Sequence, residues 1–539
     1  MTAAGTNGLG LETFDVVVIG AGPAGEVVAG RIAESGLSVA VVESERVGGE
    51  CSYWGCIPSK TLLRPGDVIA AARRVPGAEI AVSGPIDTAA AFGRRDEMVG
   101  DYSDDGQVPW LLERGVTLVR GRGRLAGPRR VDVEPPTSAE GPTATGGSTA
   151  ATSSLSGDGD GSGEQAAAGG TRRLAARRAV VLATGTTAFM PPIPGLAEAR
   201  PWDNRTATAA TAVPRRLVVL GGGAVGTELA QGFRRLGSAE VTVIEGQERL
   251  LSHEEPFAGD EVRAAFEAEG ITVRTGCRVT AVRRAVPAAD GGRGPVTVTL
   301  DDGEQIEADE LLAAVGRRPA TEDLGLETVG LTPGRPVIVD HQLRAVGVKS
   351  ATESGDGAGS ADADGETWLY AIGDVNGRAL LTHMGKYQGR IVADLITGRR
   401  DAWPRTEVDG RSAEPAEVAG PGLIPRVTFT DPQVAAVGLT EHGAREAGLT
   451  VRTVSVPTSG VAGASVRGVG LVGTSQLVVD EERRVLVGAT FTGQDVQELL
   501  HSATVAIVGE VALDRLWHAV PSFPTVSEVW LRLLESYGL

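Results

Sequence analysis

The sequence is short of cysteine and of positive charge, and each shortage excludes a class of protein. Three cysteines in 539 residues cannot form the disulfide framework that holds small secreted domains together. The 51 basic residues are outnumbered by 69 acidic ones, which gives a net charge of −18. So negative a chain repels phosphate backbones, and we expect no nucleic-acid partner.

Long apolar runs are missing as well. No stretch of about 20 apolar residues is available to span a bilayer. The first residues, MTAAGTNGLGLETFD, lack the basic cluster and the apolar run of a signal peptide. We therefore expect a cytoplasmic protein without membrane contact. With 42% hydrophobic residues, a chain of this length can bury several cores, which predicts about three or four domains.

Three segments are too poor in apolar residues for a packed core, namely 136–170, 350–366 and 405–420. Such segments cannot bury enough apolar area to offset the entropy lost on ordering, so we expect disordered surface insertions. Between them, β-branched runs alternate with alanine-rich helical stretches. This alternation is typical of an α/β fold.

One unit of strand, glycine-rich turn, helix and strand occurs twice, at residues 14–43 and 216–245. The turn allows a backbone to approach a pyrophosphate, and the helix N-terminus stabilises its charge. An acid that follows about 20 residues later is placed to bind a ribose. The pattern predicts two dinucleotide sites, and two ordinary α/β crossovers are the alternative. The glycines and acids are Gly20, Gly22, Gly25 and Glu43 in the first copy and Gly221, Gly223, Gly226 and Glu245 in the second.

Two of the three cysteines lie close together in the segment GGECSYWGCIPSK. In a regular helix, Cα atoms five residues apart are separated by about 8.7 Å, beyond the roughly 7 Å limit for a disulfide. A bridge between Cys51 and Cys56 therefore needs a distorted turn, which Gly55 and Pro58 permit, and strained disulfides are the labile ones. A metal site is the competing interpretation. Neither Cys277 nor the scattered histidines have the spacing to complete one, so we expect no metal.

Several motifs, in the same order, resemble the pyridine nucleotide-disulfide oxidoreductases, which include dihydrolipoamide dehydrogenase, glutathione reductase and mercuric reductase. GGECSYWGCIPSK resembles the redox-disulfide segment of this family, and VVLATG and YAIGDV resemble its two later FAD signatures. AVGRRP resembles the exit of the nicotinamide domain, and VTFTDPQVAAVGLTE resembles the opening of the interface domain. The resemblance extends from about residue 14 to the C-terminus.

The resemblance implies an α/β fold with two Rossmann-like dinucleotide-binding domains, for FAD and NAD, and a C-terminal α+β dimerisation domain. It also implies a homodimer, because in this family the C-terminal segment of the partner completes the disulfide pocket. The implied domains are 14–200 (first part of the FAD-binding domain), 201–329 (NAD-binding domain), 330–420 (second part of the FAD-binding domain) and 421–539 (dimerisation domain).

The resemblance also implies roles for single residues. Cys56 is the implied thiolate beside the flavin, and Cys51 the thiol that exchanges with substrate, since only a thiolate attacks a disulfide. Lys60 is implied to lie near the flavin and to pair with Glu228. For His383, an ordinary polar residue of the core is the alternative. Further residues implied to bind FAD are Gly20, Gly22, Gly25, Glu43, Thr184, Gly185, Asp374, Thr382 and His383, and those implied to bind NAD are Gly221, Gly223, Gly226, Glu245 and Gly316.

The acid of the second unit predicts which nicotinamide cofactor is used. A carboxylate at Glu245 suits the free 2′-hydroxyl of NAD and repels the 2′-phosphate of NADP. Of the residues that follow, only Arg249 carries a charge that could bind a phosphate. We expect NADH to be preferred over NADPH.

One departure from the family concerns proton transfer. The family ends in His-x-His-Pro-Thr-x-Ser-Glu, whose second histidine comes from the partner and is the acid/base for the exchange thiol. This chain reads VPSFPTVSE, with Pro521 and Phe523 at the two histidine positions. Phenylalanine cannot carry a proton, and Glu528 has no imidazole to orient. His518 is the candidate substitute.

The implied function is that of an FAD-dependent, NADH-using oxidoreductase with a redox-active Cys51–Cys56 disulfide, similar to dihydrolipoamide dehydrogenase. Its acceptor is left open by the missing histidine. A first alternative is an NADH:acceptor reductase that passes electrons from the flavin to quinones or dyes. A second is a non-enzymatic flavoprotein whose disulfide state alters a partner contact.

Overall fold

The structure is a computed structural model that describes residues 10–136, 170–285, 293–348, 367–399 and 423–539. It also gives the backbone of three short strands, β1 (Gly5–Asn7), β18 (Thr406–Val408) and β19 (Arg411–Ala413). Apart from residues 136 and 170 and the strands β18 and β19, the three predicted insertions lie outside the described residues. Their predicted disorder is therefore untested.

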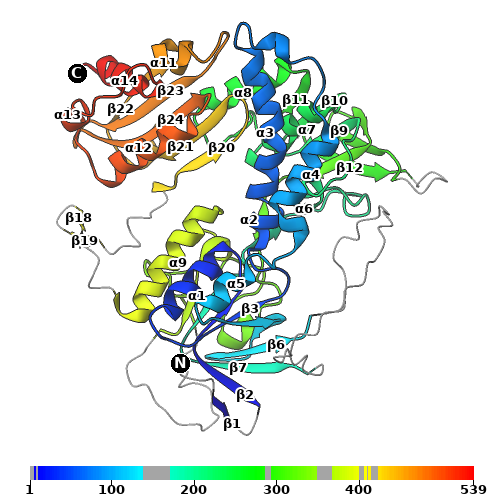
Figure 1. Cartoon of the computed structure of the whole chain (residues 1–539), viewed down its shortest axis with the longest axis vertical. Coiled ribbons are helices and arrows are strands. Elements are labelled where there is room, and N and C mark those ends of the chain that lie inside the picture. Colours follow the sequence, from blue (N-terminus) through cyan, green and yellow to red (C-terminus); the bar gives the residue numbers. More distant parts are fainter. Residues whose placement is uncertain are drawn as a thin grey trace, which may run out of the picture.

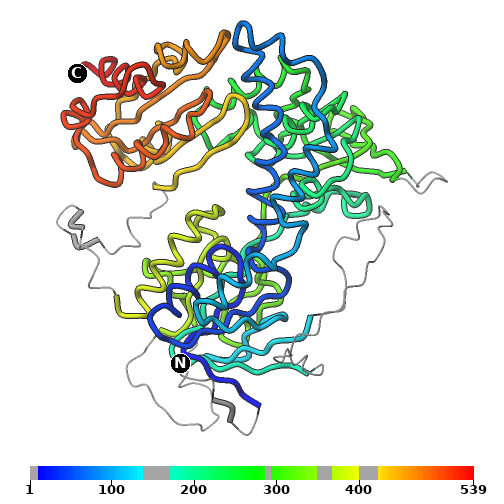
Figure 2. The backbone as a smooth tube through the Cα atoms, in the orientation of Figure 1, coloured from blue at the N-terminus to red at the C-terminus, as the bar shows by residue number. Residues whose placement is uncertain are grey.

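Three bodies make up the molecule (Figure 1). The first contains the eight-stranded sheet, the second contains a separate parallel sheet, and the third is the C-terminal sheet with its helices, coloured yellow, orange and red. Helix α3 (Cys56–Arg73) runs from the first body along the second. The trace in Figure 2 shows the chain returning to the first body, where α9 (Thr382–Thr397) lies beside α1 (Pro23–Ala33).

The first body is built on an eight-stranded sheet whose central strands are parallel and buried. Val16, Val17 and Val18 are fully buried, as expected for parallel strands that are covered on both faces. Arg31 of α1 pairs with Asp394 of α9 at 2.7 Å. The strands, besides β1, are β2 (Leu11–Ile19), β3 (Val39–Glu43), β4 (Thr117–Arg120), β5 (Arg122–Leu125), β6 (Arg130–Glu134), β7 (Arg172–Leu182) and β17 (Leu369–Ala371). The further helices of this body are α2 (Gly49–Tyr53) and α5 (Val108–Glu113), whereas α4 (Thr88–Met98) packs against α3 beside the second body.

The second body repeats this plan with a parallel sheet in the order β11-β10-β9-β15 and a smaller antiparallel sheet, β12-β13-β14. An antiparallel ribbon of β8 and β16 and the short helix α6 lie where the chain crosses between the two bodies. The elements are β8 (Thr186–Ala188), α6 (Asn204–Thr208), β9 (Arg216–Leu220), α7 (Ala224–Leu236), β10 (Glu240–Glu245), α8 (Pro256–Ala268), β11 (Ile271–Thr275), β12 (Val279–Arg284), β13 (Val296–Leu300), β14 (Gln305–Ala308), β15 (Glu310–Ala313) and β16 (Arg317–Pro319).

The third body is an antiparallel sheet in the order β20-β21-β24-β23-β22. Its core joins Phe491 of the sheet to Leu499 of α12 and Leu533 of α14. The elements are β20 (Arg426–Thr428), β21 (Gln433–Gly438), α10 (Glu441–Glu446), β22 (Val451–Pro457), α11 (Ala462–Ser465), β23 (Thr474–Asp480), β24 (Val485–Gly493), α12 (Gln497–Val508), α13 (Leu513–Leu516) and α14 (Val529–Tyr537). The predicted fold class, two Rossmann-like units and a C-terminal α+β unit, is confirmed. Across the part of the chain that the structure describes, no helix has the length and apolar character needed to cross a membrane.

Candidate active site

The first glycine loop joins β2 to α1, and its shape explains its glycines. Gly20 has a φ of +102°, and a Cβ there would collide with the carbonyl oxygen of Ala183. A Cβ on Gly25 would collide with the carbonyl oxygen of Gly20, whereas one on Gly22 would meet no atom within 4 Å. Two glycines are therefore needed for close packing, and the third leaves the loop open towards a ligand.

The second loop, between β9 and α7, has the same construction. Gly221 also has a φ of +102°, and its Cβ would collide with the carbonyl oxygen of Ala314. A Cβ on Gly226 would collide with Gly221, and Gly223 has open space. Both loops end in a helix N-terminus, which favours a bound pyrophosphate.

The acids of the two units are held in the same way. Glu43 Oε2 accepts a hydrogen bond from the Ala21 amide at 2.7 Å, and Glu245 Oε2 accepts one from the Gly222 amide at 2.6 Å. Burial raises the pKa of Glu43, against the lowering effect of its backbone hydrogen bonds. Each carboxylate is thus oriented by its own glycine loop and keeps further lone pairs for a ribose.

A cavity of about 1020 Å³ connects the first glycine loop to Cys51. This volume lies at the upper end of the range for small-molecule and cofactor sites. The predicted FAD residues that line it are Gly20, Gly22, Glu43, Thr184, Gly185, Asp374 and Thr382, and Cys51 lines it as well. The cavity therefore brings most of the predicted FAD residues together, although they come from distant parts of the chain.

The two cysteines lie on different helices. Helix α2 ends at Tyr53 and α3 begins at Cys56, so the chain breaks the helix rather than distorting one turn. A Cβ on Gly55, which lies in the break, would come within 3.2 Å of the Glu50 carbonyl oxygen. Glycine therefore permits the tight turn that brings the sulfurs together. Both thiols are free in the structure.

The two thiols have opposite electrostatic environments. The Cys51 thiol donates a hydrogen bond to the Cys56 sulfur, and this is the largest influence lowering the pKa of Cys56; burial opposes it. Thr382 Oγ1, at 3.4 Å from Cys56 Sγ, and the charge of Lys60 lower that pKa further. The pKa of Cys51 is raised, first by the same hydrogen bond and then by burial. These opposite shifts favour Cys56 over Cys51 as the position of the negative charge in the reduced pair.

The predicted pairing of Lys60 with Glu228 is present, with Nζ 2.6 Å from Oε2. The Glu228 side chain is only 5% exposed. Its other oxygen accepts a hydrogen bond from the Phe429 amide at 2.9 Å, and Lys60 Nζ lies 4.9 Å from the centre of the Phe429 ring. All three bodies thus meet at this ion pair. Phe429 was not predicted, although it lies inside the motif VTFTDP.

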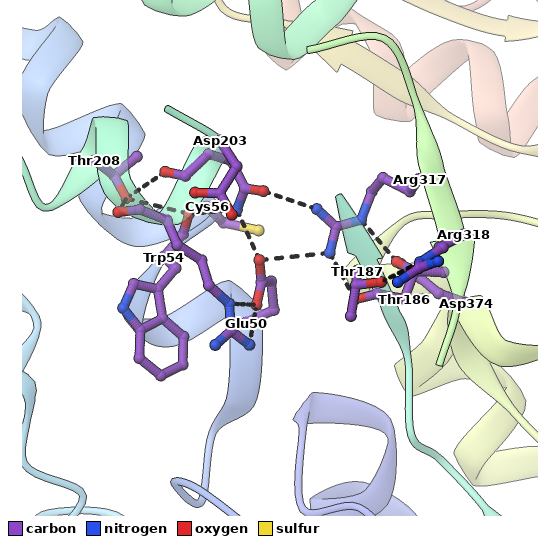
Figure 3. Close-up of polar contacts among 12 residues, drawn as sticks. Glu50, Trp54, Cys56, Thr186, Thr187, Asp203, Thr208, Arg317, Arg318 and Asp374 are labelled. Atoms are coloured by element: carbon purple, nitrogen blue, oxygen red, sulfur yellow. Dashed lines mark hydrogen bonds and ion pairs between the residues drawn. The ribbon is translucent and has the colours of Figure 1, made fainter. Parts of the chain in front are cut away.

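A polar network adjoins the cavity at the crossover between the first two bodies (Figure 3). Asp374 Oδ2 accepts a hydrogen bond from Thr186 Oγ1 at 2.9 Å, and Arg317 Nε donates to the same hydroxyl at 2.7 Å. Burial raises the pKa of Asp374, and the hydrogen bond from Thr186 lowers it in part. Of the motif AVGRRP only Gly316 was predicted as a site residue. The side chain that makes the contacts is Arg317.

Other predicted residues are less closely connected to the cavity. Gly316 has a φ of +126° and open space at its Cβ position. His383, near the start of α9, has its Nε2 atom 2.8 Å from the Pro425 carbonyl oxygen and is exposed. Arg249 Nη2 donates to the Ser252 carbonyl oxygen at 3.0 Å, so one nitrogen of its guanidinium is already used within its own loop.

The C-terminal segment carries exposed apolar side chains. Phe523 is 75% exposed and Val520 is 85% exposed, and His518 is exposed as well. Glu528 Oε2 is buried without a hydrogen-bond partner among the described residues. The single chain therefore leaves both the apolar surface and the carboxylate without partners.

The family described as pyridine nucleotide-disulphide oxidoreductase matches residues 14–389, and its dimerisation domain matches residues 424–533. Dihydrolipoyl dehydrogenase of Rhizobium etli is 30% identical over 98% of both chains, and that of Thermus scotoductus is 31% identical over 98% of both. Mercuric reductase of Staphylococcus aureus is 27% identical over 96% of this chain and 81% of its own.

Solved structures support the fold. The HOCl-induced flavoprotein disulfide reductase RclA of Escherichia coli has a TM-score of 0.72 at 22% identity. LpdA of Mycobacterium tuberculosis has a TM-score of 0.73 at 22% identity. Each likeness covers 97% of this chain and 99% of the other chain.

Proposed function

Because the chain belongs to the pyridine nucleotide-disulphide oxidoreductase family, we propose that it is an FAD-dependent enzyme that uses NADH to reduce its Cys51–Cys56 disulfide and then an acceptor. The observation that carries this proposal is the grouping of Cys56, Thr382 and the Lys60–Glu228 pair beside the cavity. Members of the family are enzymes, so the interpretation as a non-enzymatic binding protein is set aside.

The residues of the cavity suit FAD. The first glycine loop would hold the pyrophosphate, because it ends in a helix N-terminus that favours negative charge. Glu43 would accept hydrogen bonds from a ribose hydroxyl, and Asp374 would accept them from the ribityl chain. When bound, FAD supplies a group that accepts a hydride and passes on two electrons. Lys60, held by Glu228 at 2.6 Å, would favour negative charge there.

The thiols divide the remaining work. Reduction of the disulfide by two electrons and one proton breaks the S–S bond and leaves a thiolate at Cys56 and a thiol at Cys51. The lowered pKa of Cys56 and the raised pKa of Cys51 support this division. Before Cys51 attacks an acceptor disulfide it must lose its proton, because only the thiolate is the nucleophile. Phe523 cannot accept that proton, so we expect slow exchange.

The proposed donor is NADH rather than NADPH. Glu245, oriented by the Gly222 amide at 2.6 Å, would bind the 2′-hydroxyl and repel a 2′-phosphate. Arg249 donates to the Ser252 carbonyl oxygen and would have to give up this contact to bind a phosphate.

Slow exchange favours a second acceptor class. Quinones and dyes that accept electrons directly from a flavin need no thiol base. The missing histidine is the observation that supports this candidate. Its loss slows exchange with an acceptor disulfide but does not affect electron transfer from the flavin to a quinone or dye. Cys51 and Cys56 would then be dispensable for turnover.

The match to the dimerisation domain supports a homodimer. Exposed apolar side chains on α12 and beyond it, among them Val505, Trp517 and Phe523, are candidates for burial at a two-fold interface. A monomeric mass at micromolar concentration, with full activity, would contradict this assembly.

The test is a screen of the purified protein with NADH against lipoamide, small disulfides, Hg(II) and quinones. Turnover that disappears in Cys51→Ser identifies the disulfide route, and turnover that persists identifies direct transfer. Absence of NADH turnover with every acceptor, in protein that retains its flavin, would overturn the proposal.

A further inference from the structure

Glu50, the residue before Cys51, makes contacts that the proposed reaction does not use. Its Oε1 atom accepts a hydrogen bond from Asn204 Nδ2 at 2.7 Å, and its Oε2 atom accepts one from Arg205 Nε at 2.7 Å. Arg317 Nη2 lies 3.4 Å from Oε1. One carboxylate on helix α2 thus contacts two guanidinium groups and an amide from other elements (Figure 3).

The partners of Glu50 come from both passages of the chain between the first two bodies. Asn204 and Arg205 open α6, which follows the outward crossover, and Arg317 opens β16 on the return. Arg317 Nη1 also donates to Asn204 Oδ1 at 3.1 Å, which joins the two passages to each other. Glu50 therefore connects α2 to two segments that are themselves joined by a hydrogen bond.

The other end of α2 is held by the same helix α6. Asn204 Nδ2 donates to the Trp54 carbonyl oxygen at 3.0 Å, and Thr208 Oγ1 donates to it at 3.3 Å. The Arg205 guanidinium lies 4.2 Å from the centre of the Trp54 ring. Both ends of the helix that carries Cys51 are therefore fixed against α6.

We propose that Glu50 is a positioning residue for the Cys51–Cys56 pair. By holding α2 against α6 and β16, Glu50 sets the reduction potential of this pair. The proposal rests on the proposed function, which makes this pair redox-active. A dithiol closes to a disulfide more readily when its sulfurs are held close together, since less conformational freedom is lost. If α2 is loosened, the effective concentration of one thiol at the other falls. The disulfide then forms less readily and is easier to reduce.

The test is the equilibrium of the flavin-loaded protein with reduced and oxidised dithiothreitol, with thiols counted after alkylation. In this exchange the protein disulfide gains two electrons and one proton from reduced dithiothreitol, which releases its second proton to solvent and closes to its cyclic disulfide. We expect Glu50→Ala to lower the constant for disulfide formation about tenfold, which raises the potential by roughly 30 mV. Glu50→Gln keeps an oxygen acceptor, so it should show less than half of the logarithmic change.

The matched control is Glu307→Gln. Glu307 also pairs with an arginine, Arg216, at 3.4 Å, but it is 67% exposed and lies on β14. This variant should leave the equilibrium unchanged. A role of Glu50 in stability alone would lower the melting temperature and leave the potential where it was.

Arg205→Gln provides a second route to the same clamp without changing α2. It should shift the equilibrium in the direction of Glu50→Ala, and the double variant should shift it by less than the sum. Shifts below twofold in both single variants, or shifts towards a more stable disulfide, would overturn the proposal. If Glu50→Ala loses its flavin, Glu50→Gln and Arg205→Gln decide. Failure of the proposed function is recognised separately, because NADH would then release no thiols in the wild type.

Discussion

The thiol end of the cavity and the C-terminal segment differ in how many of their polar groups have partners. Beside the cavity, Cys56 contacts Thr382, and Lys60 contacts Glu228, whose second oxygen is bound by a backbone amide. In the C-terminal segment, Phe523 is exposed and Glu528 Oε2 has no partner among the described residues.

This contrast separates two tasks of the family. The groups proposed to bring electrons to the thiols are packed inside one chain, where each contacts its neighbours. The group that removes a proton from the exchange thiol is, in the family, supplied from the C-terminal segment of the partner. Proton removal from the exchange thiol can therefore be lost while electron transfer to the thiols persists.

The largest expected effect is the loss of all disulfide turnover in Cys51→Ser, since no other described thiol lines the cavity. Reduction of quinones or dyes should persist.

Cys56→Ser should abolish a long-wavelength absorption band, which a thiolate beside the flavin gives. The band is measured without air, after dithionite has reduced the protein by two electrons. A Cys56→Ser protein that keeps this band would show that the sulfurs have been assigned in the wrong order.

The C-terminal segment can be repaired by Phe523→His. A positioned general acid/base contributes about 10²–10⁴-fold, so disulfide turnover should rise by roughly 10²-fold while flavin reduction by NADH, followed by stopped flow, stays nearly constant. The unpartnered Glu528 Oε2 would orient the new imidazole. Phe523→Leu is the control and should change neither rate.

High disulfide turnover in the wild type would contradict this prediction. In that case His518→Ala becomes the decisive variant. A large loss there would show that the pocket has been rebuilt around His518.

Much of the fold could be predicted, because strand and glycine patterns are local. Residues 14–43 and 216–245 carry their whole motif within about 30 positions, and both strands end at the predicted acids, Glu43 and Glu245. The Lys60–Glu228 pair was reached through resemblance alone, since nothing local in the sequence connects positions so far apart.

The contacts that were missed are those made between bodies. Arg317, Phe429 and Glu50 reach partners more than a hundred positions away. No sequence pattern around a charged or aromatic residue indicates which distant residue it will contact. The nearest available signal was that Arg317 and Phe429 lie inside motifs that were already recognised.

The donor preference is expected to be a smaller effect. NADH should exceed NADPH in kcat/KM by about 5- to 150-fold, equivalent to roughly 1–3 kcal/mol, because Glu245 would face the additional phosphate. Glu245→Gln should narrow the ratio. Equal efficiencies in the wild type would mean that Arg249 leaves the Ser252 carbonyl oxygen to bind the phosphate.

The smallest expected effect is a shift in the pH at which the Cys56 thiolate forms. Because the pKa of Cys56 is lowered, the long-wavelength band should persist below the usual thiol pKa of about 8.5 and fade as the pH falls through the lowered value. Thr382→Val removes a hydrogen bond that stabilises the thiolate, so the midpoint should move upwards by about one pH unit, or ~1.4 kcal/mol.

Thr397→Val is the matched control, since Thr397 ends the same helix α9 and bonds only within it, to the Ala393 carbonyl oxygen at 2.8 Å. Its midpoint should equal that of the wild type. The readout is the absorbance of the band during an anaerobic pH titration of protein reduced by two electrons. An unchanged midpoint in Thr382→Val would mean that Cys51 and Lys60 alone hold the charge on Cys56, and that the packed end of the cavity tolerates the loss of one partner.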